Sequence, residues 1–292
     1  MPDILRAIIS MILAMFFFTL ADLFVKLASY TLTPGMIVFF MGAGTAVFFY
    51  AALRWQGQTA FKWSYLHWTV MMRNIGEVGA ALGMIIALSY VPLSTVTAIL
   101  QSQPLLLTAV GGLFLKERVG IRRALAVFVG FIGVMVILQP GAESFSSTSL
   151  LVLIAVIGMT IRDVGSRLLP GRIPTLSIAL SGAVLIALSG LVMITLSEAF
   201  IWPSGSALFY VIAMSVTASI GVYCITNAMR LGELSVVSPF RYIKIVFGVG
   251  AGVLILAEPL TLSVAIGSVI VTAAGLYAFM RERYLIRQQS DR

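Results

Sequence analysis

Long apolar stretches alternate with short polar connections along this chain, and the connections carry most of its charged residues. Each stretch has the length that an α-helix needs to cross the hydrocarbon core of a bilayer. Backbone groups in lipid must bond within the protein, and the stretches lack the two-residue alternation of membrane β-strands. We therefore predict an all-α integral membrane protein with ten transmembrane helices, at residues 4–29, 34–53, 66–90, 94–115, 122–138, 148–168, 173–197, 206–230, 234–256 and 263–280.

The composition favours a membrane protein over a soluble one. Of the 292 residues, 60% are hydrophobic and only 10% are charged, and the mean hydropathy is +1.06. A soluble protein of this size needs a more highly charged surface to stay dissolved. The single cysteine, Cys224, excludes an internal disulfide.

The basic residues indicate which helix ends face the cytoplasm. With the N-terminus inside, fourteen Lys and Arg residues lie at inner helix ends and Lys26 alone lies at an outer end. Cytoplasmic loops concentrate positive charge in this way, so we predict a bacterial-type inner-membrane protein with both termini cytoplasmic. This distribution accounts for the net charge of +8. We expect no nucleic-acid partner, because no basic stripe carries interleaved aromatic residues.

The two halves of the chain resemble each other when one is shifted by 141 residues. The matches are Asp22 with Asp163, Lys26 with Arg167, Leu93-Ser94 with Leu234-Ser235, Val96 with Val237, Gly111 with Gly252 and Glu117 with Glu258. Several matches at one shift indicate a duplication. Each half holds five predicted helices, an odd number, so the second half enters the membrane inverted. We predict repeats at 1–141 and 142–280, followed by a basic cytoplasmic tail at 281–292.

Inverted repeats are typical of alternating-access transporters, whose binding site lies between the halves near the midplane, although some channels share them. Charged residues inside a bilayer mark a cavity or a partner. Arg73, Asn74 and Glu77 lie within one predicted helix, and Arg73 and Glu77 share a face. They form either a self-neutralised structural pair or a cavity wall that binds cargo. If transport is coupled to protons, we expect Glu77 to carry them.

A second polar group follows Pro239 in the ninth predicted helix and consists of Arg241, Tyr242 and Lys244. The interior charges that we weigh are three positive and one negative, which favours a cargo with a carboxylate, a phosphate or an electron-rich ring. The alternative is that Arg241 pairs with Glu77 and that the Lys244 side chain extends to the membrane surface.

Polar residues also lie in the fourth predicted helix, where Gln101 precedes Pro104. Gln101 would bond either to cargo or to a neighbouring helix. Pro104 and Pro239 each predict a bend, because proline cannot continue the helical hydrogen bonding.

Two further charge pairs, each four residues apart, lie near the membrane faces: Asp22 with Lys26 and Asp163 with Arg167. We expect a structural or gating role for them. As inverted equivalents, one pair would help to close the outer side and the other the inner side.

Three stretches of the chain resemble the drug/metabolite transporter superfamily in its ten-helix EamA-type branch, namely ADLFVKLAS (21–29), ALSYVPLSTVTAILQSQPLLLTAVGGLFLKERV (87–119) and NAMRLGELSVVSPFRYIKIVFGVGAGVLILAEPLTL (227–262). Glu117 and Glu258 match the family's helix-terminal glutamates. The SPFRY stretch recurs in the branch that contains riboflavin, S-adenosylmethionine and amino-acid transporters. The resemblance implies an inverted five-plus-five fold with a central cavity, lined by helices 1–4 and 6–9. It does not fix the cargo, because family substrates are diverse.

We therefore expect a transporter of a small organic metabolite, such as an amino acid, most simply an exporter. Uptake of a riboflavin-like or S-adenosylmethionine-like compound is the alternative, and a channel is a more remote one. An enzyme is not expected, because no cluster supplies a base and a nucleophile. We expect no cofactor and no metal, and as partners only the small-molecule substrate and the lipid bilayer, with the protein a monomer or homodimer.

Overall fold

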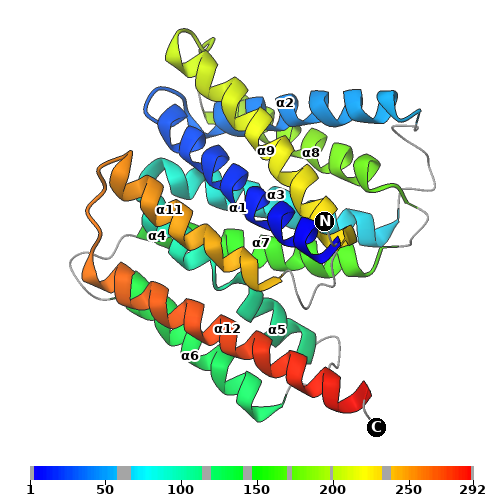
Figure 1. Ribbon diagram of the computed structural model, residues 1–292. Helices are drawn as coiled ribbons and strands as arrows, with labels where there is room; N and C mark the ends of the chain where they lie inside the picture. The colour runs from blue at the N-terminus through cyan, green and yellow to red at the C-terminus, as the bar shows by residue number, and fades with distance from the viewer. Residues whose placement is uncertain are drawn as a thin grey trace. The chain divides into compact units, whose positions relative to one another are not determined.

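The computed structural model describes residues 3–57, 67–113, 120–140, 147–169, 173–197, 200–231 and 238–290. Within these ranges every regular element is helical, as Figure 1 shows. The elements are α1 (Asp3–Ala28), α2 (Pro34–Trp55), α3 (Trp68–Tyr90), α4 (Leu93–Leu100), α5 (Gln103–Leu113), α6 (Ile121–Leu138), the 3-10 helix η2 (Ser147–Ser149), α7 (Leu150–Arg167), α8 (Thr175–Ser197), α9 (Ser206–Leu231), the 3-10 helix η3 (Ser238–Tyr242), α11 (Ile243–Leu254) and α12 (Leu262–Ser290).

The helices have the length and the surface of membrane-spanning segments. In the described ranges, eight helical segments are long and apolar enough to cross a membrane, and Ala124–Leu138 is a shorter apolar helix. Large apolar side chains such as Val47 and Phe128 are exposed to 70% and 65%, a surface that suits lipid rather than water. The all-α membrane fold is confirmed at this level. The count of ten helices and the cytoplasmic termini stay predictions.

Two predicted helices are interrupted. The fourth, 94–115, divides into α4 and α5 at Gln101 and Ser102, with Pro104 in the first turn of α5. Proline fits a first turn because its missing N–H has no partner there anyway. The described part of the ninth, 234–256, divides into η3, which contains Pro239, and α11. At the shift of 141 residues Gln101 matches Tyr242, so the two interruptions fall at the same position of the predicted repeats.

The chain divides into two compact units, and each draws residues from both predicted repeats. The first unit comprises Met1–Phe16, Pro92–Leu150 and Tyr223–Arg292, and the second comprises Phe17–Val91 and Leu151–Val222. This division by packing does not follow the boundary at residue 141, which stays a prediction about the origin of the sequence.

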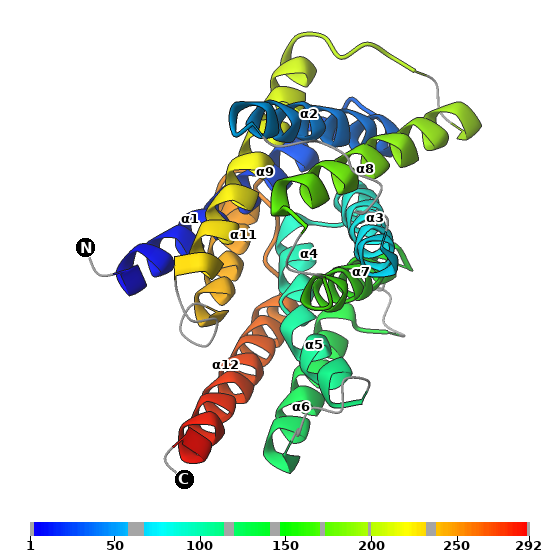
Figure 2. The same cartoon turned by 90° about the vertical axis from the view of Figure 1, so that its right-hand side faces the viewer.

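Glycines bring the helices of the second unit into close contact. Helices α2 and α8 lie side by side in Figures 1 and 2, with Gly190 against the backbone of Phe39. Helix α3 packs against α7 in the same way, since Gly158 lies against the backbone at Gly76 and Ala80. A Cβ at these glycines would overlap backbone atoms. Membrane helices use small residues in this way, because association in lipid depends on close packing.

The first unit is built on two helix pairs. Helices α6 and α12 lie side by side (Figures 1 and 2), with Gly133 of α6 against Ile270 and Val271 of α12. Helix α4 packs against α11. The shift of 141 residues relates the spans that pack together. It maps the predicted span of α2 onto that of α8, the span of α4–α5 onto that of η3–α11, and the span of α6 onto that of α12. In an inverted repeat, equivalent spans that lie near the symmetry axis contact each other.

Replacing Gly190 with alanine should destabilise the protein by about 1–3 kcal/mol, the usual cost of overpacking, because the new Cβ meets the backbone of Phe39 and Gly35. Gly250→Ala in α11 is the matched control, because a Cβ there meets no atom within 4 Å. It should leave stability unchanged or raise it slightly. Thermal unfolding of both purified variants in detergent measures the difference. Equal midpoints would contradict this account of α2–α8 packing.

Candidate functional site

The two interrupted helices meet in the first unit, and polar side chains gather there. Helix α4 runs antiparallel to α11, since Ser94 lies near Gly252 and Thr97 lies against Gly248. At the far end of α4, the side-chain amide of Gln101 donates to the carbonyl oxygen of Arg241 at 3.2 Å. Gln101 therefore joins the interruption of one span to the interruption of the other.

Glu258 holds the opposite end of the α4–α11 pair. Its carboxylate accepts hydrogen bonds from the amides of Leu93 (2.7 Å) and Ser94 (3.0 Å) and from the Ser94 hydroxyl (2.9 Å). These are the free amides of the first turn of α4, where negative charge is stabilising. Gly252 leaves room for the carboxylate. Ala257, just before it, has a left-handed backbone (φ 53°), which is unfavourable for a residue with a Cβ.

Of the four buried hydroxyls without a hydrogen-bond partner in the described part of this unit, two belong to α4 and η3. They are Thr97 Oγ1, which lies against Gly248, and the Tyr242 hydroxyl, which lies against Gly275 of α12. Both side chains are at least nine-tenths buried. A buried polar group without a partner costs about 1–3 kcal/mol. Tyr242 therefore offers an unused donor and acceptor beside the helix interruption.

Two basic residues and several buried polar residues are described at the interruption. Gln101, Ser102, Gln103 and Tyr242 are buried. Arg241 lies in the last turn of η3 and Lys244 in the first turn of α11, and both are half-buried. Amide and hydroxyl donors beside two cations are suited to a carboxylate, a phosphate or an electron-rich ring.

A separate cluster of charges lies in the second unit. Arg73 of α3 pairs with Glu77 at 2.9 Å, one turn along the same helix. Arg162 of α7 lies 3.9 Å from the same Glu77 oxygen and bonds Asp163 at 2.9 Å. Two arginines and two carboxylates thus form a cluster that is neutral as a whole.

Helix α8 completes this cluster with neutral groups. Arg73 donates to the Asn74 side chain (3.0 Å) and to the Ile178 carbonyl (3.3 Å), and Asn74 donates to the Ser181 hydroxyl (2.9 Å). Gly182 of α8 gives the Arg73 guanidinium its room, because a Cβ there would overlap it. The cluster therefore ties α3 to α7 and α8.

Arg162 is the residue of this cluster that the sequence reasoning missed. Its place within a predicted helix and beside Asp163 was the available signal. The balance of interior charges that favoured an anionic cargo left both residues out. With them included, Arg73 and Glu77 belong to a balanced group in the second unit, whereas Arg241 and Lys244 belong to the first unit.

The residues predicted to act as gates lie near helix ends and in the charge cluster of the second unit. Asp22 and Lys26 are buried, and the Lys26 ammonium donates to the carbonyls of Leu88 and Val91, at the C-terminal end of α3. Lys26 therefore satisfies carbonyls that the helix leaves free. Asp163 bonds Arg162, and Arg167 ends α7. The Arg167 side chain and Glu117 lie outside the described residues. The gating role of both predicted pairs and the Glu117 match stay predictions.

Comparison with known proteins shows which family the chain resembles. Residues 5–139 match the EamA-like transporter family, and relatives with transporter names cover most of the chain. This part of the chain therefore matches the EamA-like transporters, and the chain as a whole is similar to proteins named as transporters of the drug/metabolite transporter superfamily. The match to the family model covers the first predicted repeat.

Relatives of this EamA-like protein have been named for different cargoes. The chain is 24% identical over 204 residues to an S-adenosylmethionine uptake transporter of Rickettsia felis, and this alignment covers 70% of the chain and 69% of the relative. It is 28% identical to a riboflavin transporter of Vibrio cholerae (58% and 57% covered). It is also 28% identical to the pseudopaline exporter CntI of Pseudomonas aeruginosa (93% and 95% covered).

The fold also has a counterpart among solved structures. A crystal structure of a protein that is 19% identical aligns with a TM-score of 0.67 and covers 96% of this chain and 98% of that one. At this identity the likeness shows the fold alone.

Replacing Glu258 with alanine should destabilise the EamA-like protein by about 1–3 kcal/mol, because the first amides of α4 and the Ser94 hydroxyl lose their acceptor. Thr97→Val at the same α4–α11 contact is the matched control. Thr97 has no partner to lose, so this nearly isosteric change should be neutral or stabilising. Thermal unfolding in detergent compares them. A larger loss for Thr97→Val than for Glu258→Ala would overturn the capping role.

Proposed function

We propose that this protein carries a small organic metabolite across the bacterial inner membrane by alternating access, with the cargo bound where the two interrupted spans meet. The observation that carries the proposal is the bond from Gln101 to Arg241, which joins interruptions at equivalent positions of the two predicted repeats. Transporters built from inverted repeats bind substrate at discontinuous helices, whose free ends contribute charge and hydrogen bonds.

An amino acid or a related small polar compound is the proposed cargo. Arg241 and Lys244 supply positive charge for a carboxylate, and Gln101 and the Tyr242 hydroxyl supply hydrogen bonds. The relative named for S-adenosylmethionine supports this class, because that compound contains an amino-acid group. Riboflavin-like cargo is the alternative, supported by the relative named for riboflavin and by the ability of Arg241 to stack on a ring.

Export is the proposed direction. The relative named as an exporter is aligned over 93% of this chain, whereas the uptake transporter for S-adenosylmethionine is aligned over 70%. Uptake remains the alternative on the strength of that second relative. Transport in both orientations of sealed vesicles distinguishes the two.

Counterflow into proteoliposomes tests the proposal, with labelled amino acids, riboflavin and S-adenosylmethionine offered separately. Saturable exchange of one class is expected for a carrier, whereas a channel gives no counterflow and an enzyme gives a changed product. Arg241→Ala should slow exchange by roughly 10-fold to 100-fold, the loss of one charge-assisted hydrogen bond.

Arg54→Ala is the matched control, because Arg54 is exposed in the last turn of α2, and its exchange rate should equal that of the wild type. Both variants must show the wild-type elution volume and unfolding midpoint before their rates are compared. Undiminished exchange in Arg241→Ala would exclude this arginine from the binding site.

A further inference from the structure

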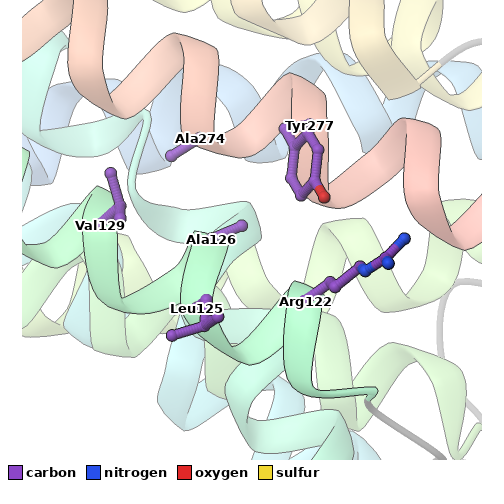
Figure 3. Close-up of a pocket in the computed structure, with 6 residues that line it drawn as sticks. All are labelled: Arg122, Leu125, Ala126, Val129, Ala274 and Tyr277. Atoms are coloured by element: carbon purple, nitrogen blue, oxygen red, sulfur yellow. The ribbon is translucent and has the colours of Figure 1, made fainter.

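A groove between α6 and α12 of the first unit has one charged end and an apolar trough. Its volume is about 310 Å³, and it is lined by Arg122, Leu125, Ala126, Val129, Ala274 and Tyr277. Figure 3 shows that the Arg122 side chain reaches toward the α12 side at the end where the Tyr277 ring lies, whereas Val129 and Ala274 lie at the other end. The groove therefore combines a cation and a phenol at one end with alkyl groups at the other.

The polar end is available to a ligand. Arg122 is exposed, and no described residue forms an ion pair or a hydrogen bond with it. The first amides of α6 add partial positive charge at this end, since Gly120 supplies no side-chain cap. Helix α6 contains no acidic residue. The ligand that complements this end is an anion.

The trough faces the lipid side of the helix pair. Leu125, Phe128 and Val129 of α6 are 56%, 65% and 46% exposed. Ala126 and Ala274 are nearly buried and form its floor, because small residues let α6 and α12 approach closely. In a membrane such a surface is covered by acyl chains. An anionic head and an acyl chain in one molecule describe a phospholipid.

We propose that the α6–α12 groove binds an anionic phospholipid, with the phosphate held by Arg122 and the Tyr277 hydroxyl and an acyl chain along Val129 and Ala274. Basic pockets between transmembrane helices on the cytoplasmic side bind such headgroups. The predicted orientation places Arg122 on that side, at the ends where the chain concentrates its basic residues. The site is separate from the helix interruptions proposed to bind cargo, and its test needs no transport.

Native mass spectrometry of the full chain in detergent measures the affinity for dioleoylphosphatidylglycerol against dioleoylphosphatidylcholine, which have the same chains. The wild type should prefer the glycerol lipid. Arg122→Gln should weaken its binding about fivefold, the usual contribution of one basic residue near a membrane surface. Arg122→Lys should keep most of the preference, and Arg54→Gln, a change at an exposed arginine outside the groove, should keep all of it.

A second variant tests the trough without changing charge. Val129→Trp fills the groove from its exposed side and should weaken binding of both lipids, while leaving the unfolding midpoint unchanged. An unchanged preference in Arg122→Gln, or none in the wild type, overturns the proposal. Displacement of the lipid by millimolar inorganic phosphate also overturns it in favour of a free anion. A dimer that Val129→Trp dissociates overturns it in favour of a second copy of the chain.

Discussion

A helix that ends within or near a bilayer leaves backbone amides and carbonyls that lipid cannot satisfy, so other parts of the protein must bond them. Three of the polar residues that stand out in this apolar sequence serve that need. Glu258 accepts from the first amides of α4, Gln101 donates to a carbonyl of η3, and Lys26 donates to carbonyls at the end of α3. Much of the polar chemistry in the described helices is therefore fixed by the requirement to satisfy helix ends.

The same requirement shapes the proposed cargo site. Once Gln101 and Glu258 hold the two ends of the α4–α11 pair, the interruption at the Gln101 end has a fixed position. Arg241, Tyr242 and Lys244 are then presented from a short 3-10 helix and the first turn of α11. A site held in place by its supporting bonds loses less entropy when cargo binds.

The sequence was sufficient for the all-α membrane fold and insufficient for the contacts between helices. Apolar length predicts a spanning helix because the bilayer sets that length, and a spacing of four residues places Arg73 and Glu77 on one face, where they are 2.9 Å apart. The interruption at Gln101 was expected only as a bend at Pro104, because whether a helix bends or stops depends on partners for the freed groups. Arg162 joins Glu77 across two helices, and Glu258 reaches an amide 165 residues earlier in the chain. Such contacts depend on packing that no local pattern encodes.

The glycines explain how charged side chains can enter this packing at all. Arg73 is large and costly to bury, yet it reaches the Ile178 carbonyl because Gly182 leaves its guanidinium space on α8. Glu258 reaches α4 because Gly252 leaves its carboxylate space on α11. The difference between the two cases lies in charge. The cluster around Arg73 contains its own counter-ions and anchors helices, whereas the charge of Glu258 is stabilised by amides of α4. The cations described near the interruption are Arg241 and Lys244. In the proposed site, an anionic group of the cargo would therefore meet its positive charge at the interrupted helices, on Arg241 and Lys244.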